Sequence, residues 1–202
     1  MKKPMLYLPL QHHSTTDWDF SAATWQLSTA QFISPPSSLR AVSGVMNILS
    51  KLEAAYCVPA GRKVSYIRQH GGSYNNGFIF RVQRPSGSAW VMSRYVVWQT
   101  AINRWGFGRY VNTTFTTLGE WVILVPIDTW HRFRVTWWTG EDEEGHPALC
   151  VKLEREEDSI WVDYGNRYDT ANMWADSQVN RLGICLYATD SFFDDTEIWI
   201  PA

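Results

Sequence analysis

Tryptophan and arginine occupy four of the five alternate positions in one short segment of the sequence, residues 130–138. In an extended strand, successive side chains point to opposite faces. One face then carries rings and guanidinium groups, from Trp130, Arg132, Arg134 and Trp138. We expect Trp137 to be buried because it shares the other face with Phe133 and Val135. Indole rings can stack on the C–H face of a sugar while polar groups read its hydroxyls, so the first face is a candidate surface for binding a glycan or another subunit. The same Arg–Trp neighbours could also form cation–π pairs.

A second group of residues resembles the groove of β-sandwich lyases in its residue types. It comprises Arg68, Gln69, His70 and Tyr74, which lie at a loop entry without the alternation of a strand face. We add Arg68 and Tyr74 to the candidate binding residues.

A glycoside hydrolase needs two carboxyl groups that face one cleft, roughly 5 to 9.5 Å apart. The acidic segment 141–144 lies between Gly140 and Gly145, which is typical of a solvated turn, and Glu120 has no evident partner. Motifs for a serine nucleophile, a phosphate-binding loop or a zinc protease are absent from the sequence. A glycan-active hydrolase or lyase is therefore the third choice, and we expect no enzyme.

The composition predicts a folded chain with an unusual number of large rings. Twelve of the 202 residues are Trp, aromatic residues make up 15%, and hydrophobic residues make up 45%. No apolar run reaches the roughly 20 residues that span a bilayer, so we expect no membrane insertion. The first ten residues contain two prolines and make a poor signal peptide. The localisation stays unknown, and the candidates are a virion surface and the extracellular space.

Charge is distributed unevenly along the chain. Residues 1–140 contain 14 Lys or Arg against five Asp or Glu, whereas residues 141–202 contain four against 15. We expect the two halves to interleave in one fold and to compensate each other. The arginines are spread singly along apparent strands, a pattern that favours pairing with carboxylates or rings over a nucleic-acid partner.

Many short segments alternate with period two and are separated by turn signals, which predicts an all-β fold. The turn signals include Gly106-Phe107-Gly108 and Gly165-Asn166, and residues 45–56 could form either a short helix or a strand. We expect a single-domain antiparallel β-sandwich, a jelly roll, over residues 18–202, preceded by an N-terminal arm at residues 1–17.

Three stretches resemble the concanavalin A-like lectin and glucanase superfamily, which includes laminin-G-like domains and carbohydrate-binding modules. They are the strand entry at residues 34–40, the hairpin at residues 130–153 and the closing strand at residues 192–200. The resemblance implies a jelly-roll fold, and function does not follow from the fold alone. Many of these modules hold a structural calcium ion, and the resemblance implies a site at Asp194 and Asp195, which Asp19 could complete from across the sheet.

The three cysteines, Cys57, Cys150 and Cys185, have no metal-binding spacing. Cys150 and Cys185 lie in apolar strand-like runs, where a buried free thiol is expected, and a disulfide stays open.

These observations favour a non-catalytic jelly-roll protein that acts by binding or assembly. It could be a structural component of a virion surface, such as a decoration or fibre protein, that contacts other protein subunits and also adheres to glycans. The alternative is a carbohydrate-binding module proper. In the assembly version, we expect residues 1–15 to pack on a neighbouring chain.

Overall fold

The computed structural model describes residues 25–41, 60–70, 76–83, 93–174 and 191–200 in full, and the backbone alone of residues 5–9, 18–19, 46–50, 181–186 and 201. Every regular element in these ranges is a β-strand, so the predicted all-β class is confirmed. None of the described segments is a helix with the length and hydrophobicity that a bilayer crossing requires.

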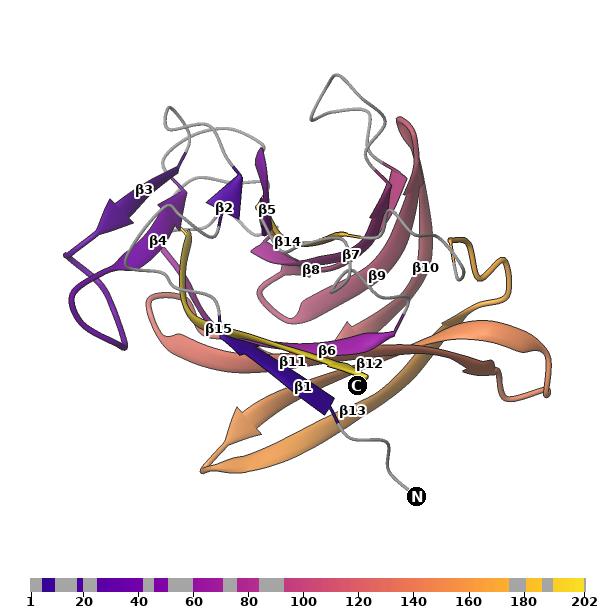
Figure 1. Ribbon diagram of the computed structural model, residues 1–202. Coiled ribbons are helices and arrows are strands. Elements are labelled where there is room, and N and C mark those ends of the chain that lie inside the picture. The colour runs from indigo at the N-terminus through magenta and orange to yellow at the C-terminus, as the bar shows by residue number, and fades with distance from the viewer. Residues whose placement is uncertain are drawn as a thin grey trace.

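The strands form two antiparallel sheets, which we name sheet A and sheet B (Figure 1). Sheet A has the order β13 (Ile160–Asp169), β12 (Pro147–Glu157), β11 (Trp130–Glu141), β6 (Gly61–Gln69), β15 (Ser191–Pro201), β4 (Ser38–Ala41) and β3 (Trp25–Ser28), and β1 (Met5–Pro9) also pairs with β15. Sheet B has the order β10 (Thr114–Val122), β9 (Arg104–Val111), β8 (Ser93–Ala101), β7 (Asn76–Gln83), β14 (Arg181–Leu186), β5 (Met46–Ser50) and β2 (Trp18–Asp19). The predicted β-sandwich is thereby confirmed.

Large rings fill the space between the two sheets. Trp25, Trp105, Trp121 and Trp137 are each at most 1% exposed, so the prediction that Trp137 is buried is correct. Phe80 of sheet B stacks on Trp137 of sheet A, with ring centroids 5.0 Å apart. Part of the Trp excess therefore serves the core, where large rings bury the most apolar surface per residue.

Sheet B is strongly curved, and its outer face, which points away from sheet A, is concave (Figure 1). A second and smaller hydrophobic cluster lies on this outer face. It contains Ile79, Val82 and Val96, against which Trp98 and Tyr110 pack. The two strand faces of sheet B are therefore both apolar in part.

Two of the predicted turns are wrong, because glycine plays a different part in each. Gly106 and Gly108 lie inside strand β9, and Gly165, with a φ of 84°, lies inside strand β13. In β9 the missing side chains make room for rings of the neighbouring strands, which is a recognised use of glycine in a sheet. Of the segment that could be helix or strand, residues 46–50 form a strand.

The N-terminal segment runs along the closing strand. Residues 5–9, which fall in the predicted arm and in the segment expected to pack on a neighbouring chain, pair antiparallel with β15 of their own chain, Met5 opposite Pro201 and Pro9 opposite Glu197. The boundary between arm and domain stays a prediction.

Ion pairs join the basic front part of the chain to its acidic end, as the charge distribution predicts. The pairs across residue 140 are Arg109–Asp169, Arg132–Glu156, Arg132–Glu197 and Arg134–Glu154. Strands β11 and β12 are neighbours although they fall on opposite sides of the charge boundary, so the charges compensate locally.

Candidate functional site

Strand β11 places the predicted binding residues on the outer face of sheet A. Phe133, Val135 and Trp137 point inward and are buried. The alternate residues are half-buried on the outer face, and they are Trp130, Arg132, Arg134, Thr136 and Trp138. The alternation seen in the sequence therefore gives the correct division between the faces.

Arg132 contacts two carboxylates and two aromatic rings on this face. Its two terminal nitrogens each bond a carboxylate oxygen at 3.1 Å, one from Glu156 and one from Glu197. Its guanidinium also lies over the rings of Tyr66 and Trp161, 5.3 and 5.5 Å from their centroids. Burial lowers the pKa of Arg132, but the hydrogen bond with Glu156 and the charge of Glu197 outweigh this effect and raise it overall.

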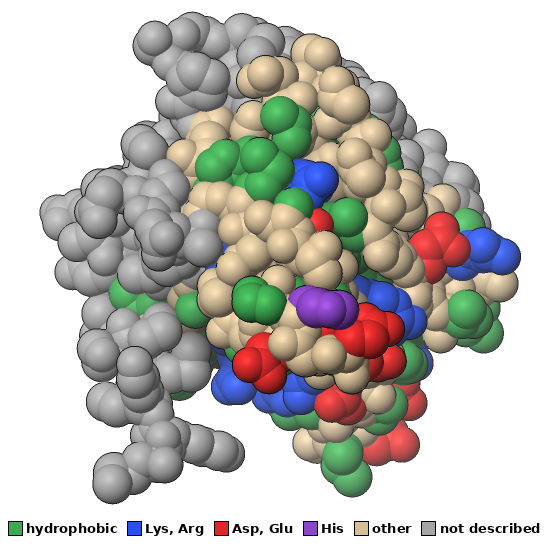
Figure 2. Space-filling view, turned by 90° about the vertical axis from the view of Figure 1, so that its right-hand side faces the viewer, with side chains coloured by type: hydrophobic (Ala, Val, Ile, Leu, Met, Phe, Trp, Pro, Cys, Tyr) green, Lys and Arg blue, Asp and Glu red, His purple; other side chains and the backbone are tan. Residues whose placement is uncertain are grey.

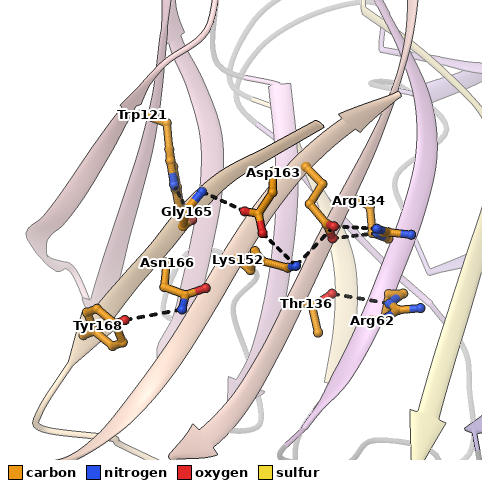
Figure 3. A network of polar contacts seen from close by, with 10 residues as sticks. Arg62, Trp121, Arg134, Thr136, Lys152, Asp163, Gly165, Asn166 and Tyr168 are labelled. Atoms are coloured by element: carbon orange, nitrogen blue, oxygen red, sulfur yellow. Dashed lines mark hydrogen bonds and ion pairs between the residues drawn. The ribbon is translucent and has the colours of Figure 1, made fainter. Parts of the chain in front are cut away.

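Arg134 is engaged in the same way by the adjacent residues of β12 and β13. Its Nε bonds Glu154 at 2.6 Å, a second nitrogen bonds the other oxygen of Glu154, and its guanidinium lies 4.2 Å from the centroid of Trp161. Lys152 bonds both Glu154, at 3.2 Å, and Asp163, at 3.0 Å (Figure 3). Burial raises the pKa of Glu154, but the hydrogen bond and charge of Arg134 outweigh it and lower the pKa overall.

Trp130 and Arg68 lie together at the other end of this face. They are opposite each other in the β6–β11 pairing, and Phe192 contacts both of them, the Trp130 ring at 6.4 Å and the Arg68 guanidinium at 5.7 Å. Arg68 also bonds the Asp128 carboxylate at 3.3 Å. The structure thus gathers five of the six candidate residues on one face, and the sixth, Tyr74, lies outside the described residues.

The side chains of Gln69 and Arg68 point to opposite faces of β6, as they must for neighbouring residues in a strand. Arg68 points outward, whereas Gln69 is 3% exposed and accepts a hydrogen bond from the Asn76 amide at 2.9 Å. His70 is exposed and contacts Asp128. Arg68, Gln69 and His70 therefore do not line one groove.

The carboxylates predicted to bind calcium already accept hydrogen bonds from the backbone. Asp194 is fully buried, and its oxygens accept from the N–H groups of Ile33 at 2.7 Å, Ser34 at 3.0 Å and Asp195 at 2.9 Å. Asp195 accepts from the Ser34 hydroxyl at 2.7 Å. These bonds hold both carboxylates in place, and the two described carboxylates alone do not supply the six to eight oxygen ligands that Ca²⁺ takes. The side chain of Asp19 lies outside the described residues, and the calcium site stays a prediction.

The turn between β11 and β12 holds another cluster of metal-ligand residue types, Asp142, Glu144 and His146. This turn faces the viewer in Figure 2, where acidic side chains gather beside a histidine. Asp142 Oδ1 accepts from the backbone N–H groups of Glu144 and His146, at 3.0 and 2.8 Å. These bonds account for the cluster as a polar turn, in agreement with the solvated turn that the sequence predicts.

Cys150 is a free and buried thiol, as predicted, while the side chains of Cys57 and Cys185 lie outside the described residues. The Cys150 thiol has a raised pKa because of its burial and the nearby charge of Asp142. It contacts the carbonyl groups of Glu141 and Ala148.

The concave face of sheet B carries an aromatic cluster that the sequence reasoning missed. Trp98 contacts Phe115 edge to face at 5.2 Å, Phe115 contacts Tyr110 at 4.7 Å, and Arg94 lies 4.2 Å from the Tyr110 centroid. Trp98 and Tyr110 are half-buried, and Phe115 is 36% exposed. We name Trp98, Tyr110 and Phe115 the aromatic cluster.

Two glycines of β9 provide the space for these rings. A Cβ at Gly106 would lie 2.9 Å from the Trp98 ring, and a Cβ at Gly108 would lie 2.5 Å from the Phe115 ring. The alternation Trp105-Gly106-Phe107-Gly108 is the signal that could have revealed the cluster, because it places two glycines on one face of a strand and two buried rings on the other.

The sequence matches no known protein family and no curated protein. Solved structures share the architecture. The carbohydrate-binding module CBM66 from Bacillus subtilis has a TM-score of 0.57 and 13% identity, over 90% of this chain and 95% of that one. The exoplasmic/lumenal domain of VIP36, in a form bound to Ca²⁺ and Man3GlcNAc, has a TM-score of 0.59 and 12% identity, over 97% and 88%. The marine PL-14 alginate lyase from Aplysia kurodai has a TM-score of 0.57 and 13% identity, over 97% and 98%.

These neighbours establish the class of fold. Together with the two antiparallel sheets, they show that the chain adopts a concanavalin A-like jelly roll, as the resemblance implied. The neighbours include both glycan-binding domains and a lyase. The fold therefore does not determine the function, which has to be inferred from the residues on the surface.

Proposed function

We propose that the protein is a non-catalytic, lectin-like binder of uncharged glycans, and that the aromatic cluster on the concave face of sheet B is its binding surface. The observation that carries this proposal is the partly exposed group of Trp98, Tyr110 and Phe115 beside the glycine positions of β9. Aromatic faces favour the apolar C–H face of a sugar ring, and flanking hydroxyls can read its polar edge. Thr117, opposite Gly108 on the edge strand, is exposed and offers such a hydroxyl.

The glycan-binding neighbours support this proposal. CBM66 is named as a carbohydrate-binding module, and the VIP36 domain was solved with Man3GlcNAc. If this chain binds a glycan, it would do so with the same β-sandwich fold but with different surface residues.

The state of two described carboxylates, Glu154 and Asp194, supports the non-catalytic part of the proposal. A general acid for glycoside cleavage needs a raised pKa and access to the substrate. Glu154 has a lowered pKa and is held by Arg134. Asp194 has a pKa raised by burial, but it is fully buried and accepts three backbone hydrogen bonds.

The proposal is tested by measuring glycan binding by the wild type and by variants that lack aromatic rings on one sheet or the other. We expect wild-type protein to bind neutral oligosaccharides on a glycan array, and the W98A/F115A variant to lose at least tenfold in affinity by calorimetry, about 1.4 kcal/mol. W130A removes a half-buried Trp from the outer face of sheet A and should bind like wild type.

Failure of the wild type to bind any neutral glycan would refute the proposal, as would loss of binding in W130A but not in W98A/F115A. Release of new reducing ends or unsaturated sugars from a polysaccharide by the wild-type protein would refute its non-catalytic part.

A structural role in an assembly, for example on a virion surface, is the second candidate function. Exposed apolar side chains around the end of β10 favour it, namely Val122 (75% exposed), Leu124 (61%), Ile102 (42%) and Ile127 (38%). Apolar side chains exposed together are a common feature of subunit contacts. Light scattering should show an oligomer that the V122D/L124D variant disrupts, and a wild-type monomer would count against this role.

A further inference from the structure

Residues on the outer face of sheet A form a row of hydrogen-bond donors that crosses the strands. Strand register places them side by side in the order Trp199 (β15), Arg62 (β6), Thr136 (β11), Lys152 (β12) and Asn166 (β13). At about 4.8 Å between strands, the row is about 19 Å long. Figure 3 shows Asn166, Lys152, Thr136 and Arg62 following one another across the sheet. We name these five residues the donor row.

Aromatic side chains border the donor row on one side. Two positions further along β11 and β13, on the same face, lie Trp138 and Tyr168, and Cys150 of β12 pairs with both of them in the strand register. Tyr168 accepts a hydrogen bond from the Asn166 amide at 3.3 Å. Trp138 and Tyr168 are half-buried, so a ligand lying along the donor row would have rings at its side as well as donors beneath it.

Carboxylates border the row on its other side, but they are already engaged. Glu154 is held by Arg134 and Lys152, and Asp163 is held by Lys152 (Figure 3). Lys152 therefore contacts two carboxylates, and its ammonium group has three N–H donors, one more than these two contacts use.

Arg62 differs from the other cations of this face in its partner. Arg132, Arg134 and Lys152 each bond at least one carboxylate. Within the described part of the chain, the hydrogen bond that Arg62 makes goes to the neutral Thr136 hydroxyl, from Nε at 3.4 Å, which leaves the terminal nitrogens of the fork for another acceptor. Burial, and then the like charge of Arg134, lower the pKa of Arg62, and the charge of Glu154 offsets them only in part.

We propose that the donor row binds an acidic polysaccharide, with a sugar carboxylate paired to the Arg62 guanidinium and the chain running across the strands between Trp199 and Asn166. A planar guanidinium matches a carboxylate in two parallel hydrogen bonds, which favours a uronate over a neutral sugar at this position. The Thr136 hydroxyl, the Lys152 ammonium and the second N–H of the Asn166 amide would bond hydroxyls of the neighbouring sugars, whereas the Trp199 indole N–H already donates to Glu197 at 3.3 Å. This site is separate from the aromatic cluster, which lies on the other sheet.

Calorimetry with polygalacturonate oligomers at low ionic strength tests the assignment. We expect the wild-type chain to bind them, R62A to lose at least tenfold in affinity, and R62K to retain part of it because a lysine keeps the charge without the fork. R104A removes a cation from sheet B and should bind like wild type, since Arg104 is exposed and paired with Glu120 at 3.1 Å. W98A/F115A should also bind polygalacturonate like wild type, which separates this proposal from the neutral-glycan proposal.

Two further measurements distinguish the proposed site from a folding defect and from the binding of small anions. Removing Arg62 relieves its repulsion with Arg134, so R62A should melt no lower than wild type. Phosphate and chloride at equal ionic strength should weaken polygalacturonate binding equally, as expected for screening alone.

The proposal is overturned if wild type does not bind polygalacturonate, or if R62A binds it as tightly as wild type. Selective displacement by phosphate would show a small-anion site and would overturn the polysaccharide assignment.

Discussion

The outer faces of the two sheets both combine arginine with aromatic rings, yet they differ in how many carboxylates bond the arginines and in how the rings contact one another. On sheet A, Arg132 and Arg134 lie over Trp161 and are bonded to Glu154, Glu156 and Glu197. On sheet B, the rings of the aromatic cluster lie against one another and beside the glycine positions of β9.

The difference teaches that ring and arginine content does not by itself mark a binding surface. An arginine that is bonded to carboxylates and stacked on a ring is held in place by these neighbours, and its removal should affect folding more than binding. A ring with an exposed face and an arginine without a carboxylate partner remain able to bind a ligand. By this criterion, we expect Arg132 and Arg134 to serve structure and Arg62 to remain able to bind a ligand.

The largest expected effect is on the stability of sheet A. In E154Q, Arg134 and Lys152 lose the charge of a carboxylate that is 3% exposed. Breaking a buried ion pair from one side is strongly destabilising, and we expect the free energy of unfolding in urea to fall by about 3 kcal/mol. E143Q removes an exposed carboxylate and should change it by less than about 0.5 kcal/mol. Equal effects of the two variants would show that the pairs on sheet A contribute little.

A smaller effect is expected on sheet B from G108A. The added methyl group would lie 2.5 Å from the Phe115 ring and force it to move. Overpacking of this kind costs about 1 to 3 kcal/mol, so we expect a loss of about 2 kcal/mol in urea unfolding together with weaker binding of neutral glycans. Polygalacturonate binding should be unchanged. If G108A leaves neutral-glycan binding intact, Phe115 is not part of that surface.

The smallest effect is a difference in pH dependence. The pKa of Glu154 is lowered in the folded protein from its ordinary value of 4.5, so its pairing stabilises the fold fully above that pH and less as the pH falls through the folded pKa. We expect the unfolding free energy of wild type to decline below pH 4.5 by on the order of 1 kcal/mol more than that of E154Q. Parallel curves for the two proteins would contradict a paired, ionised Glu154.

Much of the architecture could be predicted because strand alternation is a local property. The segment 130–138 divides correctly into a buried and an outer face, and the predicted hairpin at residues 130–153 and closing strand at residues 192–200 lie in β11, β12 and β15. The glycine signals failed in β9 and β13, because the same residue that permits a turn also makes room for a neighbouring ring or a bulge.

The sequence by itself determined the all-β class, the sides of β11 and the need for charges from the two halves to meet. Only the tertiary structure decided which charges meet. Register across β6, β11, β12 and β13 pairs Arg134 with Glu154 and leaves Arg62 beside Thr136. Likewise, Trp98 and Phe115 come together only because β8, β9 and β10 are adjacent. Contacts between strands depend on pairing order and register, which arise from the packing of the whole sandwich rather than from any single segment.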